Sequence, residues 1–235
     1  MRRPVLTICT ALGVLVLLAL GTWQVARLQW KLGLIERTEA RVGADPVPVT
    51  GLLAEGADPD DLAYTPVTVS GGFPTADAAH VFGTHEGRAG WFVFQPVLLD
   101  TPVRDARYLF LNRGFVAQEA RQAVYPLPED GEITGLLRTF EEIGGVAALV
   151  RAPNDPAADS YYDRQFATLT GAFAELGPPG AFVSAVYVDS TMPTTLPRGG
   201  TTRLDFSNRH LGYAITWYGL AGGLVLVYLA MVRRR

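Results

Sequence analysis

Two long uncharged segments, one near each end of the chain, constrain the fold more than any other feature of the sequence. Residues 4–26 and 211–232 contain no Asp, Glu, Lys or Arg and consist mainly of apolar side chains. About 20 consecutive apolar residues are enough for a helix to cross the hydrocarbon core of a bilayer. We therefore predict transmembrane helices at residues 5–26 and 209–232.

Basic residues flank both segments on the side of the chain ends. Arg2 and Arg3 precede the first segment, and residues 233–235 are all Arg. Because Lys and Arg accumulate on the cytoplasmic side of membrane helices, we predict that residues 1–4 and 233–235 are cytoplasmic. Residues 27–208 then form an extracytoplasmic domain, which is periplasmic if the protein lies in a bacterial inner (plasma) membrane and faces the intermembrane space in an organelle.

The first segment also has features of a secretory signal peptide. Ala19-Leu20-Gly21 offers a weak small-x-small cleavage site. The segment is long for a signal peptide, however, and it ends in Trp23, followed by Arg27. An aromatic residue and then a cation are typical of the membrane interface, so we favour an uncleaved helix.

The region between the two segments is acidic. Residues 27–209 hold 15 basic and 23 acidic residues, a net charge of −8, which argues against a nucleic-acid partner. The chain has a single cysteine, Cys9, inside the first segment. It therefore forms no disulfide within itself, and it lacks the CxxC pattern of thioredoxin-like redox sites and of covalent c-type haem attachment.

Helical spacing appears in two places in this middle region. Trp23, Arg27 and Trp30 recur at i, i+4 and i+7, so the first helix should continue through residues 27–41. One amphipathic helix is predicted from residue 159 to the Gly-Pro stop at residues 177–180. The apolar residues that define it are Tyr162, Phe166, Leu169, Phe173 and Leu176.

Alternating and β-branched segments predict strands in the rest of the middle region. Their short connections, rich in Gly and Pro, favour antiparallel pairing. The expected fold class is thus α+β, with two transmembrane helices bracketing an antiparallel β-rich domain that contains one amphipathic helix. The expected strands lie at residues 47–53, 64–73, 78–84, 91–99, 107–117, 132–140 and 182–189, with an acidic loop at 55–62.

The sequence contains no recognisable catalytic motif. It has no G-x-S-x-G, H-E-x-x-H, Walker or Rossmann pattern, so we predict that it is not an enzyme, although an envelope enzyme built from distant residues stays an alternative. His80 and His85 are five residues apart near an expected strand end. Odd separations place side chains on opposite faces of a strand, which argues against a shared metal ion.

The second apolar segment presents two different helical faces. The first face contains His210, Ala214, Trp217 and Ala221, at helical spacing from the start of the segment. The second face contains Gly and Thr side chains, and its Gly219 and Gly223 have the small-xxx-small spacing that lets membrane helices approach closely. We therefore expect the second face to pack on another helix, for which the first span is the candidate. This face consists of Gly212, Thr216, Gly219 and Gly223.

The face that contains His210 would then be available to bind a ligand. His210 lies at the outer end of its segment, at the level of the turn from Trp23 to Arg27 at the end of the first. An imidazole, flat aromatic walls and cations form a set that suits a haem with propionates. A simple polar anchor at the interface is the alternative interpretation. The remaining residues of this candidate site are Trp217, Lys31, Arg209 and Arg203.

Motifs along nearly the whole chain resemble one known family. The first is Leu20-Gly21-Thr22-Trp23-Gln24, followed by Arg27 and Trp30-Lys31. The last is Asn208-x-His210-Leu211-x-Tyr213-Ala214-x-Thr216-Trp217-x-Gly219-Leu220. Weaker middle motifs are Gly90-Trp91, Asn112-Arg113-Gly114-Phe115-Val116, Gly135-Leu136-Leu137-Arg138 and Pro153-Asn154-Asp155-Pro156. Together they resemble the surfeit-locus (Surf/Shy) family of cytochrome c oxidase assembly proteins.

The resemblance implies a function and a set of partners. It implies a membrane assembly factor for aa3-type cytochrome c oxidase that assists binding or insertion of haem a in the catalytic subunit, with His210 as the proposed iron ligand. The implied partners are oxidase subunit I, other assembly factors or a haem a synthase, and membrane lipids. A scaffold that stabilises oxidase subunits without touching haem is the alternative. The chain departs from the family pattern at Tyr161-Tyr162-Asp163-Arg164-Gln165, where a terminal Asp is missing, and at Ser207-Asn208-Arg209, where a doubled Asn is often found.

Overall fold

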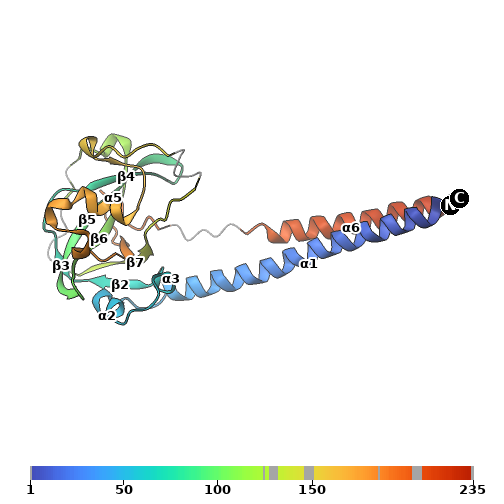
Figure 1. Ribbon diagram of the computed structural model, residues 1–235, viewed down its shortest axis with the longest axis horizontal. Coiled ribbons are helices and arrows are strands. Elements are labelled where there is room, and N and C mark those ends of the chain that lie inside the picture. The colour runs from blue at the N-terminus through green and yellow to red at the C-terminus, as the bar shows by residue number, and fades with distance from the viewer. Residues whose placement is uncertain are drawn as a thin grey trace. The chain divides into compact units, whose positions relative to one another are not determined.

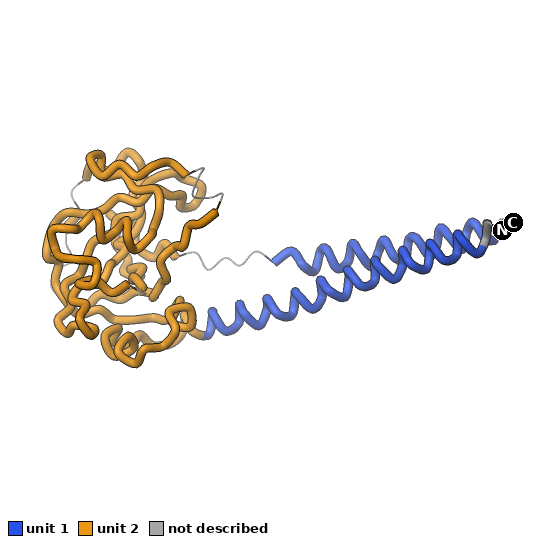
Figure 2. The backbone as a smooth tube through the Cα atoms, in the orientation of Figure 1, with its two compact units in different colours: residues 1–40, 204–235 blue, residues 41–203 orange. Residues whose placement is uncertain are grey.

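The computed structural model describes residues 2–123, 125–126, 132–145, 151–184, 186–202 and 208–233. The chain divides into two compact units (Figure 2). One unit combines residues 1–40 and 204–235, and the other comprises residues 41–203. Four residues named in the sequence analysis lie outside the described residues: Arg203, Ser207, Arg234 and Arg235.

The first unit is a pair of long helices. Helix α1 spans Arg2–Val42 and helix α6 spans His210–Arg233. They run antiparallel and side by side, with the start of α1 and the end of α6 at the same tip (Figure 1). Both are long and apolar enough to cross a membrane. Large apolar side chains such as Leu15 and Leu226 are 62% and 68% exposed, which fits a two-pass membrane protein in which lipid covers the outer faces of the helices.

The two helices meet along a narrow seam. The Tyr218 ring of α6 lies against Gly21 of α1, where an added Cβ would come within 2.8 Å of it. Side-chain hydrogen bonds cross the seam at Thr22 to Tyr218 (3.1 Å between the hydroxyl oxygens) and at Thr7 to Tyr228 (2.7 Å). Close backbone approach at small residues and polar links between helices are what hold membrane helices together.

The second unit is built on one sheet. In the part of the chain that the structure describes, nine strands form the order β1-β2-β7-β9-β6-β5-β4-β8, with β3 paired to β5. The strands are β1 Val47–Pro48, β2 Pro66–Val69, β3 Gly71–Gly72, β4 Ala79–His85, β5 Arg88–Val103, β6 Ala106–Ala117, β7 Ile133–Thr139, β8 Ser160–Tyr161 and β9 Val186–Ser190.

The alternating segments of the sequence are confirmed as strands β4, β5, β6, β7 and β9. The β4–β5 hairpin turns at Glu86 and Gly87, whose φ angles are 51° and 78°, the left-handed pair that a two-residue hairpin requires. The expectation of purely antiparallel pairing is wrong, because β1–β2, β4–β8 and β6–β9 are parallel. These neighbours are far apart along the chain, apart from β1 and β2, so hairpin-length connections could not reveal them.

Apolar side chains cover both faces of the sheet. Along β6, Leu109 and Leu111 join one buried cluster and Phe110 joins the other, as the alternation of side chains in a strand dictates. The first cluster is covered by helix α2, Val49–Ala54, through Val49. The second is covered by helix α5, Phe166–Ala172, through Leu169. The unit therefore has a core of its own.

Two expected segments differ in the structure. Residues 47–53 form β1 and then helix α2, because Val49, Leu52 and Leu53 have helical spacing and all pack on the first cluster. The expected loop at 55–62 contains the short helix α3, Pro59–Leu62. Asp58 caps it, because its side chain accepts a hydrogen bond from the Asp60 N–H (3.0 Å).

The predicted amphipathic helix is shorter than expected. Of residues 159–176, only α5 and the 3-10 turn η3, Ala174–Leu176, are helical. Ser160 and Tyr161 instead pair with β4 as strand β8. The Asp163 carboxylate accepts a hydrogen bond from the Gln165 N–H (3.0 Å), which stabilises a turn where the helix would otherwise continue.

Candidate functional site

His210 is the first residue of α6 and is half-buried. Its ring Nδ1 lies 2.8 Å from the side-chain oxygen Oε1 of Gln24 in α1. An amide oxygen can only accept a hydrogen bond, so Nδ1 must carry the proton. The lone pair of the neutral ring is then on Nε2, for which the described residues provide no hydrogen-bond partner. The imidazole thus has one nitrogen held by protein and the other available to a ligand.

The predicted aromatic walls lie apart from the imidazole. Trp217 is on the same stripe of α6 as His210, about 10 Å further along the helix. Trp23 precedes Gln24 and is 58% exposed. Within the described residues, neither indole ring contacts the His210 ring. The two Trp side chains therefore provide apolar surface near the imidazole, with no closed cage around it.

The predicted cations follow Gln24 along α1 and precede His210. Arg27 is exposed, and its guanidinium stacks on the Trp30 ring, 3.9 Å from the ring centre. Lys31 lies seven residues beyond Gln24, on the same side of a helix. Arg209 is exposed and directly precedes His210. The first unit thus carries Arg27 and Arg209 close in sequence to the contact between Gln24 and His210, and Lys31 about two helical turns further along α1.

The expected division between the two faces of α6 is reversed. Ala214 and Ala221, which share a stripe with His210, are its buried residues and face α1. A Cβ added to Gly212, Gly219 or Gly223 would meet no atom within 4 Å. The reason is that α1 supplies the small residue at this contact, Gly21. The Tyr218 ring of α6 packs against Gly21, so close approach of the helices does not require a glycine in α6.

Gln24 is the site residue that sequence reasoning missed. It is 9% exposed, in a segment that is otherwise almost entirely apolar. A lone amide within a membrane helix is a signal in itself, because an unpaired polar group is costly in hydrocarbon. Its partner could not be found from sequence, because 186 residues separate it from His210.

The other two histidines lie in the second unit, where His80 has a partner at each ring nitrogen and the buried Nδ1 of His85 has none among the described residues. His80 Nδ1 contacts the Asp159 carboxylate, and its Nε2 lies 3.2 Å from the Tyr125 hydroxyl. Burial raises the pKa of that phenol, so Tyr125 remains protonated at neutral pH. The His85 ring lies against Phe115. Since both nitrogens of His80 are occupied, its ring is not free to bind iron.

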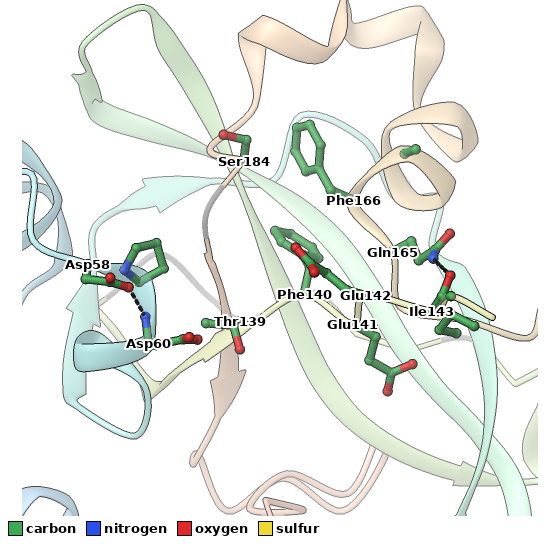
Figure 3. Close-up of a pocket in the computed structure, with 13 residues that line it drawn as sticks. Asp58, Asp60, Thr139, Phe140, Glu141, Glu142, Ile143, Gln165, Phe166 and Ser184 are labelled. Carbon is green, nitrogen blue, oxygen red and sulfur yellow. Dashed lines mark hydrogen bonds between the residues drawn. The ribbon is translucent and has the colours of Figure 1, made fainter. Parts of the chain in front are cut away.

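A surface pocket of the second unit bears several carboxylates. The pocket has a volume of about 1010 Å³ and lies between helix α3, the end of β7 and the start of α5. Figure 3 shows Asp58 and Asp60 on one side and Glu142 beside Phe140. Within the described residues, these three carboxylates form no ion pair. Their negative charge disfavours a ligand that carries propionates.

Comparison with known proteins identifies the family of this chain. The family model described as the SURF1 family matches residues 11–222. The chain belongs to the SURF1 family. The chain is also similar to surfeit locus protein 1 of Rattus norvegicus, with 32% identity over 92% of this chain and 72% of the relative. It is 31% identical to the Homo sapiens protein, over 86% and 69%, and 28% identical to the Mus musculus protein, over 92% and 72%.

The SURF1 family is known as cytochrome oxidase assembly factors. The match of this chain to the SURF1 model includes most of α1, the whole sheet and the first half of α6. Gln24 and His210 both lie inside it. The resemblance that the sequence motifs indicated is therefore confirmed at the level of the family.

Proposed function

We propose that this chain is a membrane assembly factor for aa3-type cytochrome c oxidase that binds haem a on its way to the catalytic subunit. Haem is the cargo of this function, and the chain itself performs no catalysis. The observation that carries the proposal is the His210 imidazole, with Nδ1 held by Gln24 at 2.8 Å and Nε2 directed to no described partner. A neutral imidazole in this state is ready to ligate a metal.

The surrounding residues support the same cargo. Arg27, Lys31 and Arg209 supply positive charge for propionate groups, and guanidinium–carboxylate pairs are among the stronger hydrogen bonds in proteins. Trp23 and Trp217 supply flat apolar surface at the interface and within the span. His210 would hold the iron through Nε2 alone, which suits a ligand that has to be handed on.

We also propose a location and partners for the chain. The basic residues at both ends favour a bacterial inner membrane topology with cytoplasmic termini and a periplasmic domain over residues 27–208. The cargo then enters from the lipid side or from a haem a synthase. The haem is then transferred to oxidase subunit I, which is the catalytic subunit that receives haem a.

A second candidate function is a scaffold that holds oxidase subunits without contacting haem. The pocket of Figure 3 favours it, because the carboxylates of Asp58, Asp60 and Glu142, close to two Phe rings, would suit a basic and partly apolar segment of a protein partner. In this case His210 would be only a polar link between the two spans.

A strain that lacks the chain separates the two functions. Oxidase would be isolated from this strain and its haem a content per subunit I measured. The haem function predicts assembled subunits that are deficient in haem a, restored by the wild-type chain and poorly restored by His210→Ala. His85→Gln is the matched control and should restore fully. Subunits that fail to assemble, with full rescue by His210→Ala, would establish the scaffold instead.

A further inference from the structure

Gln24 and His210 join the two helices at the outer end of their seam. His210 is the first residue of α6, so residues 208 and 209 before it are not helical. Its backbone N–H contacts the Asn208 side chain at 3.4 Å, a weak restraint at this distance. Of the described groups, only the Gln24 amide forms a hydrogen bond with the His210 ring. What orients the imidazole is therefore a residue of the other helix.

The contact also decides which ring nitrogen is protonated. A neutral imidazole has two tautomers of similar stability, and a hydrogen-bond acceptor at one nitrogen selects the tautomer with its proton there. Oε1 of Gln24 accepts from Nδ1, so the lone pair resides on Nε2. Partners of this kind orient metal-binding histidines and raise their basicity.

We propose that Gln24 is a positioning residue for His210: it fixes the Nδ1–H tautomer and the ring plane, and so leaves the Nε2 lone pair available to a ligand. The inference rests on the proposed function only for the identity of the ligand. The effect on the tautomer belongs to the chain alone and is present without haem.

Two properties of Gln24 distinguish this role from simple packing. Its side chain is 9% exposed and reaches across to α6, whereas its neighbour Trp23 is 58% exposed. Thr22, two residues away, forms a comparable link to Tyr218 without touching His210. Thr22→Val is therefore a matched control that removes this one polar link, while the Tyr218 ring packed on Gly21 still holds the register of the two helices.

The test uses the full chain in lipid nanodiscs with ¹⁵N-labelled histidine. Nitrogen chemical shifts of His210, assigned by their loss in His210→Ala, report which ring nitrogen is protonated. We expect the Nδ1–H form in the wild-type chain and in Thr22→Val, and a mixture of both tautomers in Gln24→Leu. An Nε2–H ring in the wild-type chain, or no change in Gln24→Leu, would overturn the proposal.

A second measurement uses the chain purified from cells that make haem a. Gln24→Leu should weaken haem binding by about 10- to 100-fold, as loss of such a partner does at other metal sites. Gln24→Glu keeps an acceptor with more negative charge, so it should retain haem and lower its reduction potential. Equal potentials in Gln24→Glu and the wild-type chain would contradict the role. If the wild-type chain binds no haem, the proposed function fails while the nitrogen shifts still decide the role of Gln24.

Discussion

The Tyr218 ring of α6 occupies the space that a side chain at Gly21 of α1 would fill, since a Cβ there would lie 2.8 Å from the ring. The same ring ends in a hydroxyl that lies 3.1 Å from the Thr22 hydroxyl. Shape and hydrogen bonding thus fix the register of the two spans at one level. This register also brings Gln24 opposite His210.

Gly21→Leu should therefore separate the spans. Overpacking at such a site costs about 1–3 kcal/mol, and we expect a lower melting temperature of the full chain in detergent. Gly219→Ala is the control, because a Cβ at Gly219 meets nothing within 4 Å. It should leave the melting temperature unchanged or raise it slightly. Equal losses in both variants would show that the seam lies elsewhere.

Sequence alone identified the two long apolar helices, because 23 and 22 consecutive uncharged residues match the length of a helix that crosses a bilayer. It did not identify which face of α6 meets α1. Gly219 and Gly223 have the spacing of a packing motif, but a glycine only permits close approach and does not require it. The two helices instead meet where the Tyr218 ring packs against Gly21. These residues belong to different segments, so no local sequence pattern shows that they fit together.

Gly114 shows a second steric match, in the sheet unit. Its φ is 132°, and a Cβ would lie 2.1 Å from the Arg198 carbonyl oxygen, which accepts a hydrogen bond from the Phe115 N–H (2.9 Å). Gly114→Ala should cost about 3 kcal/mol or more, from backbone strain and the displaced Arg198 segment. Urea unfolding of the full chain would measure the loss. Gly72→Ala, with open space at its Cβ, should be close to neutral.

The contact between His80 and Asp159 should contribute more to stability than the exposed ion pair of Glu86 and Arg198 does. Tyr125 directs its only proton to the Arg121 carbonyl (2.5 Å), so its oxygen accepts from His80 Nε2. Nδ1 of the same buried ring contacts the Asp159 carboxylate, so Asp159 holds one side of the imidazole. Asp159→Asn should lower the free energy of unfolding by about 1–2 kcal/mol.

The control is the exposed pair of Glu86 and Arg198, whose closest N–O distance is 2.7 Å. Glu86→Gln should cost less than about 1 kcal/mol, because water screens exposed pairs. Chemical unfolding at pH 7 would compare the two variants. A greater loss in Glu86→Gln than in Asp159→Asn would show that the buried contact of His80 with Asp159 is not the stronger of the two.

The sheet unit should lose stability at alkaline pH. Burial is the main cause that raises the pKa of the Tyr187 phenol above its ordinary value of 10.0. The unfolded chain therefore loses this proton first as the pH rises, and the free energy of unfolding falls above about pH 10, by up to about 1.4 kcal/mol per pH unit. Unfolding measured from pH 8 to 11 should be flat at first and then decline. The decline should be shallower in Tyr187→Phe, and an unchanged slope would exclude this residue as its source.

The candidate site shows most clearly which residues could be predicted from the sequence and which could not. His210 was identifiable, because it is an ionisable residue at the end of an apolar segment. Gln24 was visible only as the last residue of the motif Leu20-Gly21-Thr22-Trp23-Gln24, and its partner is 186 residues away. In the same way His80 gave no sign of Asp159, because a contact across 79 residues depends on how β4 and the turn before β8 come together.

The most direct test of haem binding is the absorption spectrum of the full chain purified from cells that make haem a. We predict a Soret band with about one haem per chain, because His210 Nε2 is available as an axial ligand. His210→Ala should lose most of the bound haem, while His85→Gln should keep it. An unchanged spectrum and stoichiometry in His210→Ala would contradict the assignment of His210 as the ligand.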